Sequence, residues 1–93
     1  MSRIRATVLA TDRFIDDAQV IYSERLLNEL ECTLSRLEVL PQIGSRILAE
    51  SIVEEFGEEV FKLLLGPFAI IYRYDEKSSI VWLLALIHQR RIW

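Results

Sequence analysis

Cysteine, glycine and proline are scarce in this chain of 93 residues, which has one Cys, three Gly and two Pro. Because Cys32 has no second cysteine to pair with, a disulfide framework and a cysteine-rich metal site are both excluded. The longest apolar run, from Ile80 to Ile87, is too short to span a membrane, and the N-terminal residues lack the apolar run of a signal peptide. We therefore expect a cytoplasmic protein with no membrane partner.

The composition is that of a compact globular domain, because 52% of the residues are hydrophobic and 27% are charged. A length of 93 residues suits one hydrophobic core and is too short for two. Residues 1–93 are therefore predicted to form a single domain. The mean hydropathy of +0.24 is high for a chain of this size. It predicts that some apolar surface is reserved for a partner.

Charge is distributed unevenly along the chain, although the net charge is only −3. Five glutamates and no Lys or Arg occur from Glu50 to Glu59, whereas the C-terminal part holds several cations. This balance disfavours a surface dedicated as a whole to nucleic acid, which needs clustered cations. Since no His or Asp joins the glutamates at ligand spacing, we expect a solvated loop or helix there, with no metal and no cofactor.

A short strand and a first helix are predicted at the start of the chain. The strand is expected from Arg3 to Leu9, where β-branched and apolar residues are frequent. Thr11 and Asp12 then form a helix-capping signal. The first helix is expected to begin near Asp12 and to end around Val20 to Tyr22.

A second helix is predicted from Glu24 to Leu40, with Ser23 as its N-cap. Its leucines recur at spacings of three and four, which is typical of an amphipathic helix. The stripe consists of Leu26, Leu27, Leu30, Leu34, Leu37 and Leu40. We expect these leucines to pack against a sheet, with part of the stripe left open as a contact for a partner. Pro41 and Gly44 end the helical part of the chain.

Three β-like runs follow, from Val60 to Leu65, from Phe68 to Tyr74 and from Ser79 to His88. Gly66-Pro67 separates the first two, and the polar segment Asp75 to Ser78 suits a hairpin loop between the last two. The order of elements predicts an α+β fold. In it, a short N-terminal strand and two helices pack with a mostly antiparallel, twisted sheet that ends in a C-terminal β-meander.

The C-terminal half resembles the toxins of the RelE/ParE superfamily. The resemblance is carried by FKLLLGPFAIIYRYD, Phe61 to Asp75, and by LIHQRR, Leu86 to Arg91. It implies the toxin of a bacterial type II toxin-antitoxin module, of the kind linked to plasmid stabilisation, which inhibits growth until a cognate antitoxin neutralises it. RelE-like relatives cut mRNA on the ribosome, whereas ParE-like relatives block DNA gyrase. A homodimer is also left open.

The candidate site residues differ between these two branches. For a nuclease, the only histidine, His88, would move protons, and Arg90 would stabilise the transition state together with Arg73. For a binding protein, the surface that meets the target or antitoxin is predicted to contain Arg73, Tyr72, Arg90, Arg91 and Trp93. The alternatives are a strand-end histidine with a structural role, an Arg73 paired with Asp75 or Glu76, and a C-terminus without function.

Departures from the nuclease pattern favour the ParE-like branch. Ala69 stands where RelE-like nucleases commonly have an arginine, and the sequence stops at Trp93, before the position of their C-terminal tyrosine. An acidic chain is also a poor match for polyanionic RNA. We therefore expect a gyrase-directed binding toxin, with enzymatic activity left open. The alternatives are a ribosome-dependent mRNA endonuclease and a non-toxic module that only binds an antitoxin.

Overall fold

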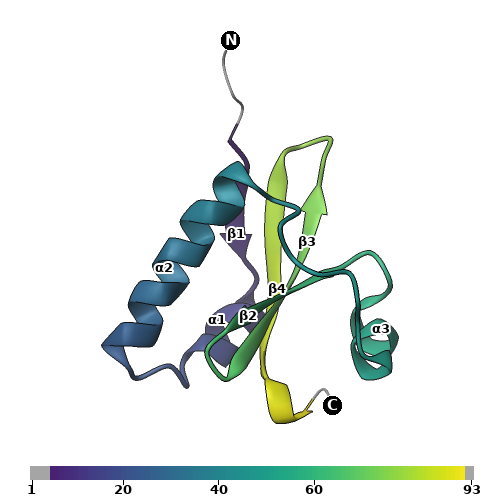
Figure 1. Cartoon of the computed structure of the whole chain (residues 1–93). Coiled ribbons are helices and arrows are strands. Elements are labelled where there is room, and N and C mark those ends of the chain that lie inside the picture. The colour runs from purple at the N-terminus through teal and green to yellow at the C-terminus, as the bar shows by residue number, and fades with distance from the viewer. Residues whose placement is uncertain (1–4, 92–93) are drawn as a thin grey trace.

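A four-stranded sheet with helices on both faces forms the protein, as seen in a computed structural model that describes residues 5–91. The strand order is β1-β4-β3-β2. The β2–β3 and β3–β4 pairs are antiparallel, and β1 lies parallel to β4. The elements are β1 Thr7–Ala10, α1 Asp12–Ala18, α2 Glu24–Val39, α3 Glu50–Phe56, β2 Phe61–Leu65, β3 Phe68–Asp75, β4 Ile80–His88 and a 3-10 helix, Gln89–Arg91. Figure 1 shows α2 on one side of the strands and α3 on the other.

The α+β fold predicted from the sequence is confirmed, together with both helix caps. The Thr11 hydroxyl accepts a hydrogen bond from the Phe14 backbone N–H at 3.2 Å, and the Ser23 hydroxyl accepts one from Leu26 at 3.4 Å. Each bond satisfies a backbone donor that the first turn of a helix leaves free. The first strand begins later than predicted, at Thr7. Arg3 lies outside the described residues.

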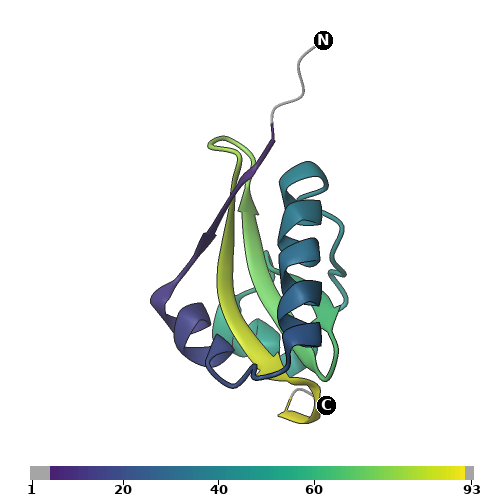
Figure 2. The ribbon, with the colours of Figure 1, turned by 90° about the vertical axis from the view of Figure 1, so that its left-hand side faces the viewer.

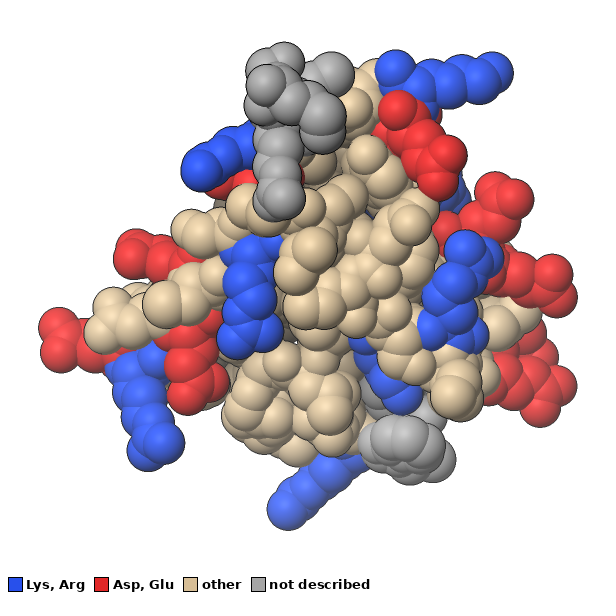
Figure 3. All heavy atoms as spheres, turned by 45° about the horizontal axis from the view of Figure 1, so that its top comes forward, with Lys and Arg blue, Asp and Glu red and all other residues tan. Residues whose placement is uncertain are grey.

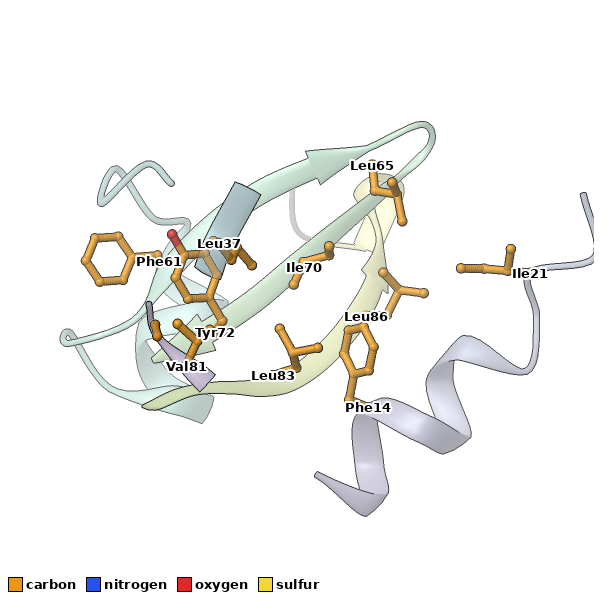
Figure 4. Packing of buried hydrophobic residues seen from close by; sticks show 11 residues of the cluster. Phe14, Ile21, Leu37, Phe61, Leu65, Ile70, Tyr72, Val81, Leu83 and Leu86 are labelled. Carbon is orange, nitrogen blue, oxygen red and sulfur yellow. The ribbon is translucent and has the colours of Figure 1, made fainter. Parts of the chain in front are cut away.

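The larger core lies between the sheet and the helices α1 and α2. Leu37 of the leucine stripe is fully buried there, and Leu26, Leu30 and Leu34 pack around it in part. Figure 4 shows Leu37, Phe14 of α1 and the strand residues that meet them. Two members of the stripe differ from the prediction, because Leu27 is 42% and Leu40 is 53% exposed. Leu40 is the C-cap residue, just beyond the last helical residue Val39.

A third helix, α3, covers the opposite face, in the acidic segment for which the sequence predicted a solvated loop or helix. Its buried residue, Ile52, packs with small and β-branched side chains of the sheet. This second core consists of Ile52, Val60, Ala69, Ile71, Ala85 and Ile87. The glutamates of α3 are exposed, as expected for a solvated acidic segment. Ile52 is therefore the one fully buried side chain of α3, and the half-buried Phe56 packs against the same core.

A β-bulge and the first helix shape the C-terminal half of β4. Ile71 pairs with Ala85 but Tyr72 pairs with Leu83, so Leu84 is an extra residue in β4. Because β1 ends at Ala10, the edge of β4 beyond Leu84 has no neighbouring strand. Asp17 of α1 covers it by accepting a hydrogen bond from the Leu86 N–H at 3.0 Å. Within residues 5–91, no helix is long and apolar enough to cross a membrane.

Candidate functional site

The turn that follows β4 is fixed to the β2–β3 hairpin by Gln89. Its backbone N–H donates to the Pro67 carbonyl at 2.9 Å, and its side-chain amide donates to the Gly66 carbonyl at 2.9 Å. Gly66 has a φ of 57°, which is the left-handed region that glycine adopts most readily. Gln89, the first residue after β4, is therefore held in a defined position.

His88 stabilises the same turn from the last position of β4. Its ring is half-buried and meets Phe68 edge-on, with the ring centroids 5.5 Å apart. Its Nδ1 atom accepts a hydrogen bond from the Arg90 backbone N–H at 3.2 Å. One of the two ring nitrogens is therefore engaged by the backbone. This geometry favours the structural interpretation of His88.

Arg90 is exposed in the 3-10 helix Gln89–Arg91. The hydrogen bonds of Gln89 and His88 hold its backbone, so its guanidinium projects from a fixed base. The side chain of Arg91 and the whole of Trp93 lie outside the described part of the structure, and the prediction that they contact a partner stays a prediction.

Arg73 is exposed on β3, opposite Trp82 of β4. Neither acidic neighbour binds it. The Asp75 carboxylate accepts a hydrogen bond from the Lys77 N–H at 3.1 Å, and the hydrogen bond from the Ser78 side chain lowers the pKa of Asp75. Glu76 accepts one from the Gln42 amide at 2.8 Å. Among residues 5–91 no ion pair of Arg73 occurs, so the alternative in which Arg73 is neutralised locally does not hold.

Tyr72 requires a correction, because it is a core residue and offers no surface to a partner. Its side chain is fully buried and stacks on Phe61 with 5.1 Å between the ring centroids. Its hydroxyl accepts a hydrogen bond from the Gly44 N–H at 2.9 Å, and burial raises the pKa of the phenol. A Cβ atom on Gly44 would lie 2.8 Å from that hydroxyl oxygen, so the close approach requires glycine.

The structure separates Arg73 from His88 and Arg90. His88 pairs with Phe68, and Arg73 lies five residues further along the same strand, which is roughly 16 Å at the usual rise of a strand. The two side chains also project to opposite faces. Phe68, beside His88, packs on the core under α2, whereas Arg73 follows Ile71 on the side of α3. The three residues therefore do not converge on one point.

Ala69 lies where an arginine is common in RelE-like nucleases, and its side chain is completely buried under α3. An arginine at this position would have no path to solvent while α3 is in place. Ala69 is therefore part of the core under α3. Within residues 5–91, no cluster of three or more His, Cys, Asp or Glu side chains could hold a metal ion.

Two residues that position the site were missed from the sequence. Gln89 anchors the C-terminal turn, and Asp17 caps the edge of β4 over a separation of 69 residues. Neither has a local signal, because each role depends on which distant backbone atom the fold brings near. The Gly66-Pro67 pair was recognised as a turn, but its carbonyls gave no indication that Gln89 would bind them.

The architecture matches that of solved toxin-antitoxin structures. A chain of the toxin-antitoxin complex RelBE2 from Mycobacterium tuberculosis gives a TM-score of 0.73 and 21% identity, over 92% of this chain and 100% of that chain. The intact RelBE complex from E. coli gives a TM-score of 0.67 and 11% identity, over 89% of this chain and 95% of that chain. The archaeal RelE-RelB complex from Pyrococcus horikoshii gives a TM-score of 0.63 and 18% identity, over 94% of this chain and 98% of that chain. The fold is therefore RelE/ParE-like.

The sequence assigns the chain within this fold class. The family of ParE toxins of the type II toxin-antitoxin system parDE matches residues 8–93. This match spans more than nine-tenths of the chain, and the protein belongs to the ParE toxin family. No curated protein sequence matches it. The resemblance to RelE/ParE toxins that the C-terminal half indicated is thus confirmed.

Proposed function

We propose that this ParE-family toxin inhibits growth by binding a cellular target, DNA gyrase by analogy with ParE-like relatives, and that a cognate antitoxin neutralises it. The separation of Arg73 from His88 and Arg90 carries the proposal. A binding surface can use cations that lie apart, because each of them makes its own contact. Cleavage of a phosphodiester bond instead needs the catalytic side chains side by side around that one bond.

The chemistry of RNA cleavage sets a strict geometric demand. A general base must reach the attacking hydroxyl within hydrogen-bond distance, and cations must surround the same phosphate. Here Nδ1 of His88 is engaged by the backbone, and Arg73 projects from the opposite face and end of the sheet. Ala69 supplies no cation. These features support a toxin that acts by binding.

The C-terminal turn is the part of the proposed surface that the fold holds most firmly. Arg90 projects from it, and Arg91 and Trp93 follow in the sequence. Guanidinium groups bind carboxylates through paired hydrogen bonds, and tryptophan contributes a large apolar contact. Because Gln89 already holds the backbone, little ordering is required when a partner binds.

Exposed apolar side chains at the C-terminal end of α2 support the antitoxin as a partner. Val39, Leu40 and Ile43 are 44%, 53% and 40% exposed and, with Tyr74, line a cavity of about 570 Å³. In Figure 3, which brings the top of Figure 1 forward, an uncharged area near the middle of the visible face has Lys and Arg side chains at its margins. An antitoxin that covered this surface would remove apolar area from water.

A supercoiling assay with purified toxin and DNA gyrase tests the proposal. We expect wild-type toxin to inhibit supercoiling and the double variant Arg90→Ala, Arg91→Ala to lose at least about tenfold in potency, since charge-assisted contacts each contribute about 1.5–3 kcal/mol. Arg36→Ala is the matched control, because Arg36 is an exposed arginine in the last turn of α2, whereas the first turn of α2 is the one that lies against Gly66 and the C-terminal turn. Full supercoiling in the presence of wild-type toxin contradicts the gyrase target.

The two alternatives have their own readouts. Primer extension on mRNA in a translating extract detects a ribosome-dependent endonuclease, and cleavage that disappears in both His88→Ala and Arg90→Ala replaces the present proposal. Strong expression without antitoxin distinguishes the third candidate, because a non-toxic antitoxin-binding module leaves growth unchanged.

A further inference from the structure

Strand β3 extends beyond its neighbour β2 at the end of the sheet that holds Arg73. The first residue of β2 is Phe61, which pairs with Tyr72, whereas β3 continues to Asp75. Figures 1 and 2 show that the C-terminal end of α2 and the β3–β4 hairpin lie at this end of the molecule. Among residues 5–91, the last residues of β3 therefore have β4 on one side and no strand on the other.

The free side of this overhang presents the backbone of Tyr74. Lys62 exchanges two backbone hydrogen bonds of 2.8 Å with Ser45 on the outer side of β2. The backbone groups of Phe61 therefore face β3, where Phe61 pairs with Tyr72. The N–H and C=O of Tyr74 point to the same side as those of Tyr72, beyond the start of β2. No loop within residues 5–91 forms a backbone hydrogen bond with Tyr74.

Two exposed arginines lie at the overhang. Arg46 and Arg73 line the same cavity of about 220 Å³, together with Phe61 and Tyr74. The guanidinium carbon of Arg46 lies 5.1 Å from the centroid of the Phe61 ring, and Nη2 donates to the Glu58 carbonyl at 3.3 Å. These contacts position Arg46 and leave most of its N–H donors free. In the described part of the chain, neither arginine forms an ion pair.

Two carboxylates restrict what this cavity can hold. Glu59 and Glu76 also line it, and Glu76 accepts a hydrogen bond from the Gln42 amide at 2.8 Å. A nucleic acid brings a row of phosphates, and the glutamates would repel those that the arginines did not bind. An extended polypeptide avoids this conflict, because it can bring one carboxylate for the arginines and backbone groups for Tyr74. The lining therefore favours a peptide over a nucleic acid.

An apolar surface adjoins the cavity across the hydrogen bond between Gln42 and Glu76. Both of these residues and Tyr74 also line the larger cavity of about 570 Å³. The apolar residues of that cavity are Val39, Leu40, Pro41 and Ile43. The two cavities are thus parts of one surface, which is apolar on the side of α2 and holds the arginines on the other side. A segment with an apolar side chain near its carboxylate is complementary to both parts.

We propose that Arg46, Arg73 and the backbone of Tyr74 form a binding site for an extended acidic segment of a protein partner. The segment pairs with Tyr74, directs a Glu or Asp carboxylate towards the two guanidiniums, and places an apolar side chain in the larger cavity. Because it rests on the proposed function, in which Arg73 contacts a protein, the site deepens that function. It adds Arg46, which no pattern in the sequence indicated.

NMR titration of the isotope-labelled chain with two capped peptides tests the site. The acidic peptide has valine-glutamate repeats, and the matched control has valine-glutamine repeats of the same length. We expect the acidic peptide to shift the Tyr74 amide signal and the Nε–Hε signals of Arg46 and Arg73 with one dissociation constant. The glutamine peptide should bind at least about fivefold more weakly, because hydrogen bonds to a carboxylate are the stronger ones. Equal affinities of the two peptides overturn the proposal.

Arginine substitutions test whether the two guanidiniums act together. Arg46→Gln and Arg73→Gln should each weaken binding of the acidic peptide at least about fivefold and leave binding of the glutamine peptide unchanged. Arg25→Gln is the control, because Arg25 is exposed in the first turn of α2, which lies against Gly66 at the opposite end of β3. The amide spectra also show that each variant is folded. An equal loss in Arg25→Gln indicates general charge attraction and overturns the proposal.

Two further probes distinguish a peptide from other anions. Inorganic phosphate should shift the arginine signals without moving the Tyr74 amide signal, because it offers no strand to pair with. A single-stranded DNA oligonucleotide should bind more weakly than the acidic peptide, and tighter binding at Arg46 and Arg73 overturns the proposal in favour of a nucleic-acid surface. The titrations contain no gyrase and no antitoxin. Their failure therefore leaves the result of the supercoiling assay intact, and failure of that assay leaves the titrations intact.

Discussion

The two faces of the sheet are covered by helices in different ways. Under α1 and α2 the core contains aromatic and long aliphatic residues, including Phe14, Phe61 and Tyr72. Under α3 it is thinner, with Ala69 and Ala85 among its residues. The 16 residues of α2 hold the first face, whereas α3 has seven. From this difference we expect α3 to detach from its face of the sheet without unfolding of the whole domain.

The largest expected effect is on the thick face. Leu37→Ala should lower the free energy of unfolding by about 4 kcal/mol, because it leaves a cavity at a fully buried site. Urea denaturation followed by circular dichroism measures the loss. Leu27→Ala is the control, since Leu27 belongs to the same stripe but is 42% exposed, and it should change stability by less than about 1 kcal/mol. Equal losses in the two variants contradict the assigned core.

The thin face should respond more locally. Ile52→Ala removes the only buried side chain of α3. We expect the global free energy of unfolding to fall by about 2 kcal/mol, which is at the low end for such truncations, because α3 can detach while the rest of the domain stays folded. Hydrogen exchange of the α3 amides should accelerate much more than exchange in β3 and β4. Uniform acceleration across the domain would mean that both faces unfold as one unit, and the comparison would fail.

Tyr72 provides a smaller, pH-dependent test on the thick face. Tyr72→Phe removes the acceptor for the Gly44 N–H and should destabilise the fold by about 1 kcal/mol near neutral pH. Burial raises the pKa of Tyr72 in the folded state, so its contribution is complete below the unfolded value of about 10 and is lost as the pH rises through the folded pKa. Wild type should therefore lose stability more steeply than Tyr72→Phe above about pH 10. Parallel curves contradict the burial of the phenol.

The smallest effect concerns the link between α1 and α3. Arg13 forms salt bridges with Glu55 of α3 and, at 3.5 Å between Nε and Oδ2, with Asp17 of α1. Its guanidinium carbon lies 5.0 Å from the centroid of the Phe56 ring. Hydrogen bonding to Glu55 raises the pKa of Arg13. Because the pair is partly exposed, Arg13→Ala should cost only about 0.5 kcal/mol. Exchange of the α3 amides should nevertheless increase. Arg25→Ala, which breaks only a pair within α2, should leave that exchange unchanged.

Signals that act over a few residues made most of the fold predictable. Thr11 and Ser23 cap the helices that follow them, the leucine spacing marks α2, and Gly66-Pro67 separates β2 from β3. The acidic segment was harder, because α3 has a single buried residue, Ile52, and no side-chain cap. Its helix is stabilised by the sheet beneath it rather than by its own sequence pattern.

The candidate site was less predictable, because its geometry depends on distant contacts. The alternation of β3 placed Tyr72 and Arg73 on opposite faces, but only the tertiary packing, with Leu37 and Phe61 in the same core as Tyr72, showed that Tyr72 is buried. Arg73 remains a candidate for binding. Tyr72 does not, because its surroundings come from elements that are far apart in the chain.

The sequence alone determined the type and order of the elements other than α3 and the membership in the ParE toxin family, since caps, periodicity and turn residues are local properties of the chain. Tertiary structure alone decided that His88 and Arg73 lie far apart, that Gln89 fixes the C-terminal turn, and that Ser45 closes the β2 edge. These features depend on strand order and on hydrogen bonds between distant backbone atoms, which no local pattern of residues specifies.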